Sequence, residues 1–115
     1  TVISSAEGKQ GYIQPNDALN TFASFGSFPD HILVDENGDL GKKFNAKTTP
    51  HIFIADKNKN IVYQGAIDDA GGSKFWTTDL NQSTNFVKKV VNDIKSNKPL
   101  SVSKTRPYGC SVKYG

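Results

Sequence analysis

Residues 52–65 limit the fold of this chain more than any other part of the sequence. Ile52–Ala55 (IFIA) is apolar on both faces, which is typical of a strand buried inside a sheet. The polar loop 56–60 (DKNKN) follows, and the chain then returns as Ile61–Gly65 (IVYQG). Two β-prone segments joined by a short polar loop predict an antiparallel hairpin whose first strand is central in a sheet.

A proline stands at the entrance to this hairpin, in the sequence Thr48-Thr49-Pro50. Because proline has no backbone N–H, its place beside a buried strand must be accommodated, and a cis bond in a tight turn is one way to do so. Such a turn would leave the backbone of Thr49 free to pair with an extended ligand. Thr49 and Pro50 are therefore the candidate substrate-binding residues.

Shorter patterns predict the elements before the hairpin. Val2–Ile3 and residues 31–34 are typical of short strands, and the turn 35–38 (DENG) closes the second one. A helix is predicted to begin with Asn16 as its N-cap and to end at Gly26. The apolar residues on one face of that helix are Leu19, Phe22 and Ala23.

The patterns around and after the hairpin are equally short. Leu40 and Phe44, four positions apart, predict a short helix ahead of the proline. Residues 67–79 have no periodicity and are expected to be a loop that Phe75 and Trp76 help to order. A longer helix is capped by Ser83 or a neighbour, and its buried face consists of Phe86, Val87, Val90, Val91 and Ile94.

Strands and helices in this order predict an α/β fold, a mixed sheet with flanking helices. We assign residues 1–97 to one domain and residues 98–115 to an extended C-terminal tail. The chain contains no Met, so we expect it to be a mature form or a fragment.

The charge pattern argues against several classes of function. The net charge is +3, but lysine supplies nearly all of the positive charge and Arg106 is the only arginine. The bidentate contacts that usually recognise nucleic acid are therefore almost unavailable, and we expect no nucleic-acid partner. No apolar run approaches the roughly 18 to 20 residues of a membrane span, so no transmembrane segment is expected.

Metal and cofactor sites are poorly supported. The loop 56–60 resembles the start of a calcium loop, but Ile61 stands where that loop needs glycine. His31 and His51 are interpreted as strand-end residues, and Asp68 and Asp69 as solvated or loop-capping carboxylates. We therefore predict no metal site and no cofactor.

Two stretches of the sequence resemble a known family. They are FPDHILVDENGDLGKKFNAKTTPHIFIADKNKNIVYQGAIDD, residues 28–69, and KPLSVSKTRPYGCSVKY, residues 98–114. Together they resemble the redoxin branch of the thioredoxin superfamily, close to the alkyl hydroperoxide reductase and thiol-specific antioxidant proteins. The resemblance implies a thioredoxin-like fold in which Thr49 and Pro50 form the cis-proline loop that faces the active cysteine.

The same resemblance implies that this chain is truncated at its N-terminus. The family's first strand, cysteine motif and first helix would precede Val2–Ile3. The only cysteine here is Cys110, which excludes an internal disulfide and is either a resolving or regulatory thiol or a structural one. The first strand would be central in the family's sheet. We therefore expect either that another chain fills the gap, with self-association through the open sheet, or that Val2–Ile3 pairs directly with Ile52–Ala55.

The function implied is that of a fragment of a thiol-dependent oxidoreductase, which carries out thiol-disulfide exchange or peroxide reduction. The chain alone is expected to be inactive, because it has no catalytic cysteine. The partners of the parent protein would be a thiol or disulfide protein, or a peroxide. The alternative is a noncatalytic thioredoxin-like module that binds peptides or proteins. The compartment stays open between the bacterial cytoplasm and the cell envelope.

Overall fold

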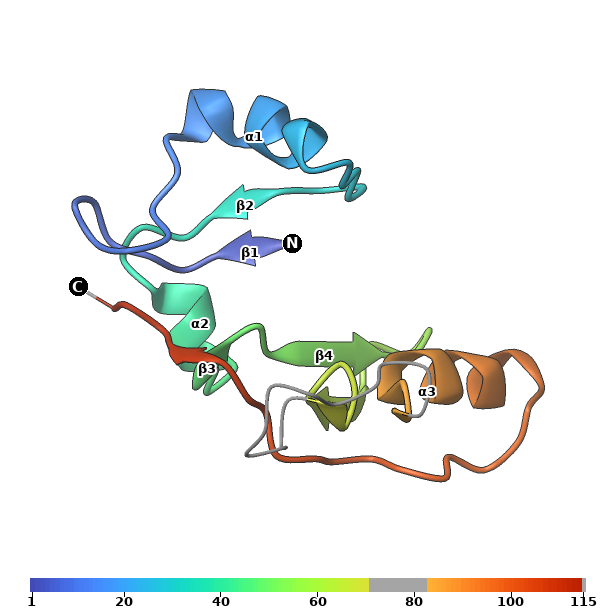
Figure 1. Cartoon of the computed structure of the whole chain (residues 1–115). Coiled ribbons are helices and arrows are strands. Elements are labelled where there is room, and N and C mark those ends of the chain that lie inside the picture. The colour runs from blue at the N-terminus through green and yellow to red at the C-terminus, as the bar shows by residue number, and fades with distance from the viewer. Residues whose placement is uncertain (71–82, 115) are drawn as a thin grey trace. The chain divides into compact units, whose positions relative to one another are not determined.

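The computed structural model describes residues 1–70 and 83–114. Both helices and short strands occur along these residues, so the predicted α/β class is confirmed (Figure 1). The chain forms two compact units. The first unit is Thr1–Ala46 together with residues 112–114, and the second unit is Lys47–Ser111.

The first unit is built on a pair of parallel strands. Strand β1 (Val2–Ile3) pairs with β2 (Leu33–Val34), with Val2 opposite Leu33. Ile3 is buried, whereas the side chains of Val2 and Leu33 are about half exposed, at 48% and 51%. One face of this small sheet is therefore apolar and open to solvent.

Helix α1 (Ala18–Ser24) begins later than the sequence predicts. Pro15 opens a 3-10 turn, η1 (Pro15–Asp17), so Asn16 lies inside that turn and does not cap α1. Its end is as predicted, because Gly26 has a positive φ of 71°.

The apolar face predicted for α1 is not buried, because Leu19 and Ala23 are exposed and Phe22 is half-buried. Ala18 is the buried residue of this helix, whereas Leu19 is 74% exposed. The short helix predicted around Leu40 is present as α2 (Asp39–Lys43), and Gly38 at its start has a φ of 72°.

The second unit contains the predicted hairpin. Strands β4 (Ile52–Ala55) and β5 (Ile61–Gly65) are antiparallel, with an irregularity between Ile54 and Ala55. In the turn, the Asp56 carboxylate accepts hydrogen bonds from the backbone N–H groups of Asn58 and Asn60, at 2.8 and 3.0 Å. This carboxylate therefore stabilises the hairpin turn that the sequence predicts.

Strand β4 is not the fully buried central strand that its composition predicts. Within the described residues it pairs with β5 alone, and its side chains are half-buried or exposed. An apolar run indicates that a segment tends to be buried, but it does not indicate how many strands will pair with that segment. The buried side chains lie next to it: Tyr63 on β5 and Val90 on helix α3 (Phe86–Lys95) are both 0% exposed.

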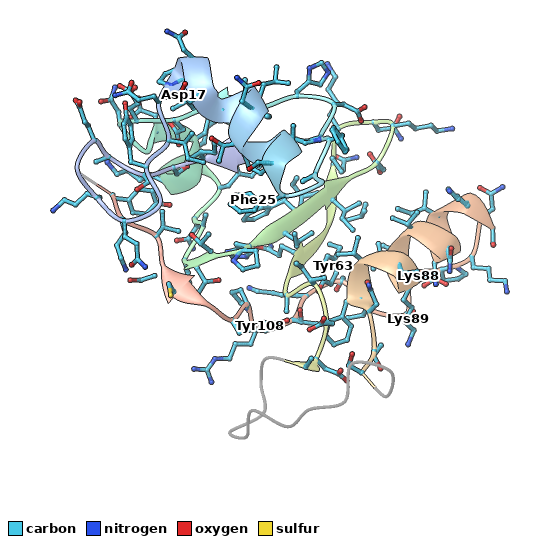
Figure 2. The ribbon with its side chains drawn as sticks, turned by 45° about the horizontal axis from the view of Figure 1, so that its top comes forward. Asp17, Phe25, Tyr63, Lys88, Lys89 and Tyr108 are labelled. Atoms are coloured by element: carbon cyan, nitrogen blue, oxygen red, sulfur yellow. The ribbon has the colours of Figure 1, made fainter. Side chains whose placement is uncertain are left out.

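Helix α3 is capped by a neighbour of Ser83, as the sequence analysis allows. The side chain of Asn85 accepts a hydrogen bond from the N–H of Lys88 at 2.9 Å. The first residue of the helix, Phe86, lies beside Tyr63 on β5, with ring centroids 6.5 Å apart. Tyr63 is labelled in Figure 2. The start of the helix therefore lies beside the hairpin.

The structure leaves three expectations about larger parts of the chain untested. The strands of the described residues form three two-stranded sheets, so a single mixed sheet stays a proposal. The division into a domain at 1–97 and a tail at 98–115 stays a prediction, and Phe75 and Trp76 lie outside the described residues.

In the ranges that are described, no helix has both the length and the apolarity needed to cross a membrane.

Candidate functional site

The Thr49–Pro50 loop lies in the second unit, immediately before β4. The bond between the two residues is cis, as predicted. The side chains of both residues are exposed. The hydroxyl of Thr48 donates a hydrogen bond to the carbonyl of Pro50 at 2.9 Å and so closes the loop on itself.

His51 follows Pro50 directly, and its ring makes two contacts next to this loop. Its Nδ1 accepts a hydrogen bond from the backbone N–H of Lys47 at 3.2 Å, and its ring stacks on Phe53 with centroids 4.4 Å apart. Burial, and then the positive charge of Lys47, lower the pKa of His51. A lowered pKa favours the neutral imidazole, in which Nδ1 is the acceptor and Nε2 carries the proton.

The backbone edge of Thr49 is not free, which corrects the sequence-based expectation. Thr48–Thr49 forms strand β3, which pairs antiparallel with β6 (Cys110–Ser111). Thr49 stands directly opposite Cys110. The tail of the chain itself therefore occupies the edge that was predicted to await an extended ligand.

Gly109 explains how the tail comes so close. Its φ is 129°, and a Cβ atom at this position would overlap the carbonyl oxygen of Thr49 and lie 3.4 Å from Cδ of Pro50. Only glycine combines that φ with this approach to the loop. The contact between the tail and the Thr49–Pro50 loop therefore depends on residue 109 having no side chain.

An earlier part of the tail is bound along β5. The N–H of Gln64 donates to the carbonyl of Ser103, and the N–H of Thr105 donates to the carbonyl of Gln64, both at 3.1 Å. The Thr105 hydroxyl lies 2.7 Å from that of Tyr63 and accepts a hydrogen bond from the N–H of Ala66 at 2.9 Å. These contacts fix the tail before it reaches β3.

Asp68 completes the attachment of the tail, whereas its neighbour Asp69 binds the segment before α3. The hydroxyl of Tyr108, labelled in Figure 2, donates a hydrogen bond to Oδ1 of Asp68, which also accepts from the N–H of Ala70 at 3.1 Å. Oδ1 of Asp69 accepts from the N–H of Thr84 at 2.7 Å. Both carboxylates therefore cap loops, as predicted, and they are not arranged as an acid/base pair.

Cys110 is a free and exposed thiol on β6. An exposed thiol can react with a disulfide or an oxidised cysteine of another molecule. Among the described residues, no group of three or more His, Cys, Asp or Glu side chains is placed to hold a metal ion. The exposed thiol of Cys110 thus lies opposite Thr49 of the proline loop.

Sequence reasoning missed several residues of this site. His51 follows the proline directly, and that position was the available signal for its role. Gly109 and Thr105 lie in a segment predicted to be a simple extended tail, where a glycine next to Cys110 has many interpretations. Their roles appear only when the tail is seen against β3 and β5.

Comparison with known proteins shows the fold and nothing more. No protein-family profile and no curated protein matches the chain. A solved hypothetical protein from Sinorhizobium meliloti is 20% identical, with a TM-score of 0.77 over 99% of this chain. An uncharacterised conserved protein from Geobacillus kaustophilus is 21% identical, with a TM-score of 0.79 over 99% of this chain.

This chain spans 60% and 58% of the lengths of those two solved chains. The structural likeness covers nearly all of the present chain, so its whole fold has counterparts in longer proteins. Neither description names an activity, and at this level of identity the likeness concerns the fold alone.

Proposed function

We propose that this chain is part of a thiol-dependent oxidoreductase with a thioredoxin-like mixed sheet, in the redoxin branch of that superfamily. The observation that carries the proposal is the register of β3 and β6, which holds the chain's only thiol, Cys110, directly opposite Thr49 of the proline loop. The thiol and the proline loop are thereby combined in one unit, in which the tail itself pairs with the edge of Thr49.

In this proposal the catalytic cysteine belongs to a part of the parent protein outside the present chain. In peroxide reduction, its thiolate attacks the peroxide and becomes a sulfenic acid, and the peroxide leaves as an alcohol or water. Cys110, as the resolving thiol, then condenses with the sulfenic acid to form a disulfide and releases one water. An external dithiol, which is itself oxidised, reduces that disulfide.

In thiol-disulfide exchange, the same cysteine attacks a disulfide of a partner protein and forms a mixed disulfide. The partner's peptide would lie against the Thr49–Pro50 loop. A second thiol then releases the reduced partner and leaves a disulfide on the enzyme. Peroxide and protein disulfide are thus the two substrate classes of the proposed activity.

The test uses the full-length product of the gene that encodes this chain. We expect that product to contain a further cysteine and to consume peroxide or reduce insulin disulfides in the presence of dithiothreitol. Replacing the further cysteine by serine should abolish turnover, and Cys110→Ser should slow only the recovery step. A full-length product that has no further cysteine, or is inactive with both substrates, refutes the proposal.

The second candidate is a noncatalytic module that binds extended peptides. The pairing of β3 with β6 favours it, because the Thr49 edge already accepts an extended strand through its main chain. A full-length product without a further cysteine that nevertheless binds peptides would support this candidate over the oxidoreductase.

A further inference from the structure

The tail of this chain is bound in three stretches, and the middle one, β6, is the shortest. From Ser103 to Tyr108 it is held by main-chain hydrogen bonds to Gln64, by the Thr105 hydroxyl and by the bond from Tyr108 to Asp68. Beyond that point, β6 is only two residues long, and both of its residues are exposed.

The tail is held again after β6. The carbonyl of Lys113 accepts a hydrogen bond from the N–H of Ala6 at 3.2 Å, and the hydroxyl of Tyr114 donates one to the carbonyl of Ala46 at 2.8 Å. Strand β6 is therefore a short, exposed segment between two anchored stretches, and its own pairing with β3 involves two residues.

The short stretch lies on the edge where a substrate would pair. Thr49 pairs with Cys110, and any other extended segment that used the same main-chain groups would need β6 to leave first. Because the tail is covalently joined to the unit, its effective concentration at this edge is of the order of millimolar. A free peptide must compete with that concentration.

Gly109 also sets a requirement for whatever replaces β6. The carbonyl of Thr49 leaves no room for a Cβ on the residue that precedes its paired partner. A competing segment that adopts the same register needs glycine at that position.

We propose that β6 competes with extended peptides for the Thr49 edge and blocks this edge until it is displaced. The edge then selects peptides that have glycine before the residue that pairs with Thr49. The inference rests on the proposed function for the role of the Thr49 edge in holding a substrate, and it adds regulation and selectivity to that role.

The test compares two glycine variants of the full chain. Gly109→Ala introduces a methyl group against Thr49, whereas Gly8→Ala is the matched control, because Gly8 has a φ of 78° and nothing within 4 Å of its added Cβ. Both variants carry the cost of a side chain at positive φ. Only the first should release β6.

The probe is a fluorescent peptide with the sequence of residues 107–113 and serine in place of cysteine, and its control peptide has alanine at the glycine position. By fluorescence anisotropy, Gly109→Ala should bind the glycine peptide at least about tenfold more tightly than Gly8→Ala does, because the tail no longer competes. The alanine peptide should bind to neither. Equal binding by the two variants, or equal binding of the two peptides to Gly109→Ala, overturns the proposal.

If Gly109→Ala does not fold, the unmodified chain serves for the test. In NMR spectra, glycine peptide added at millimolar concentration should abolish the cross-strand nuclear Overhauser effect between Thr49 and Cys110 and create one between Thr49 and the peptide. Persistence of the original signal at the highest peptide concentration overturns the proposal. Both probe peptides lack thiols, so the result is independent of whether the parent protein proves to be an oxidoreductase.

Discussion

At the scale of single residues, the best-connected carboxylate of the first unit is Asp35. It is 9% exposed and accepts hydrogen bonds from the Ser4 hydroxyl at 2.6 Å and from the N–H groups of Leu40 and Gly41 at 3.1 and 2.9 Å. Burial alone would raise its pKa, but these hydrogen bonds outweigh burial and lower it. The ionised side chain thereby joins the end of β2 to the start of α2.

This arrangement predicts how stability depends on pH. Because the pKa of Asp35 is lower in the folded state, its contribution is complete above the unfolded-state pKa of about 3.9 and is lost as the pH falls through the folded-state value. Asp35→Asn should lose roughly 1–3 kcal/mol at pH 7 and show a weaker dependence on pH in the acid range. Urea unfolding at several pH values measures both effects. The exposed Asp30→Asn is the control, and an equal loss in that variant would contradict the prediction.

Thr105 is the corresponding residue in the second unit. Its hydroxyl satisfies the N–H of Ala66 and contacts the hydroxyl of Tyr63, which is fully buried. Thr105→Val keeps the shape but leaves the N–H of Ala66 without its acceptor, whereas the Tyr63 hydroxyl keeps its hydrogen bond to the carbonyl of Ala66, so we expect a loss of roughly 1–3 kcal/mol. Thermal and urea unfolding measure it. Thr84→Val, at an exposed position, should change stability by much less, and similar losses for both would contradict this role of Thr105.

At the scale of elements, α3 depends on one cap. The Asn85 side chain supplies the acceptor for the N–H of Lys88, one of the groups that a helix start leaves without an intrahelical partner. Asn85→Ala should therefore cost about 0.5–2 kcal/mol, whereas Asn85→Asp should retain most of the stability. Circular dichroism during urea unfolding distinguishes the two variants. If both lose the same stability, the cap is not the source of the effect.

The elements also show which local signals can be interpreted from sequence. The hairpin, the turn before α2 and the end of α1 were predicted, because each depends on residues close together in sequence. The start of α1 was not, because Pro15 forms a 3-10 turn in the place where Asn16 was expected to act as a cap. The burial of β4 was overestimated, because it depends on which segments pack against the strand.

At the scale of the whole molecule, the first prediction concerns activity. The isolated chain has a single cysteine, so a complete dithiol cycle within one molecule is impossible. We expect no peroxide consumption or insulin reduction above the rate of the dithiothreitol background, and Cys110→Ser should behave identically. Turnover that is lost on Cys110→Ser would show that Cys110 is catalytic by itself.

The second prediction at this scale concerns association. Val2 and Leu33 leave an apolar face half exposed on a sheet of only two strands, which favours pairing with another chain. Light scattering should therefore show a mass that rises with protein concentration. Leu33→Thr should weaken the effect, and Ile61→Thr, on the edge of the second unit's hairpin, should not. A strictly monomeric chain over the measured range contradicts this expectation.

The sequence by itself determined the α/β class, the hairpin, the capped helix α3 and the loop-capping roles of the aspartates, because periodicity, turn residues and caps act between neighbours. It also located the proline loop. Only the tertiary structure decided what lies against that loop. Thr49 and Cys110 are far apart along the chain. Their pairing requires a glycine at 109, because a Cβ there would overlap the Thr49 carbonyl. It also requires Thr105, which holds the tail to the end of β5. Pairing between such distant segments is selected by the fit of the folded chain, for which no local pattern exists.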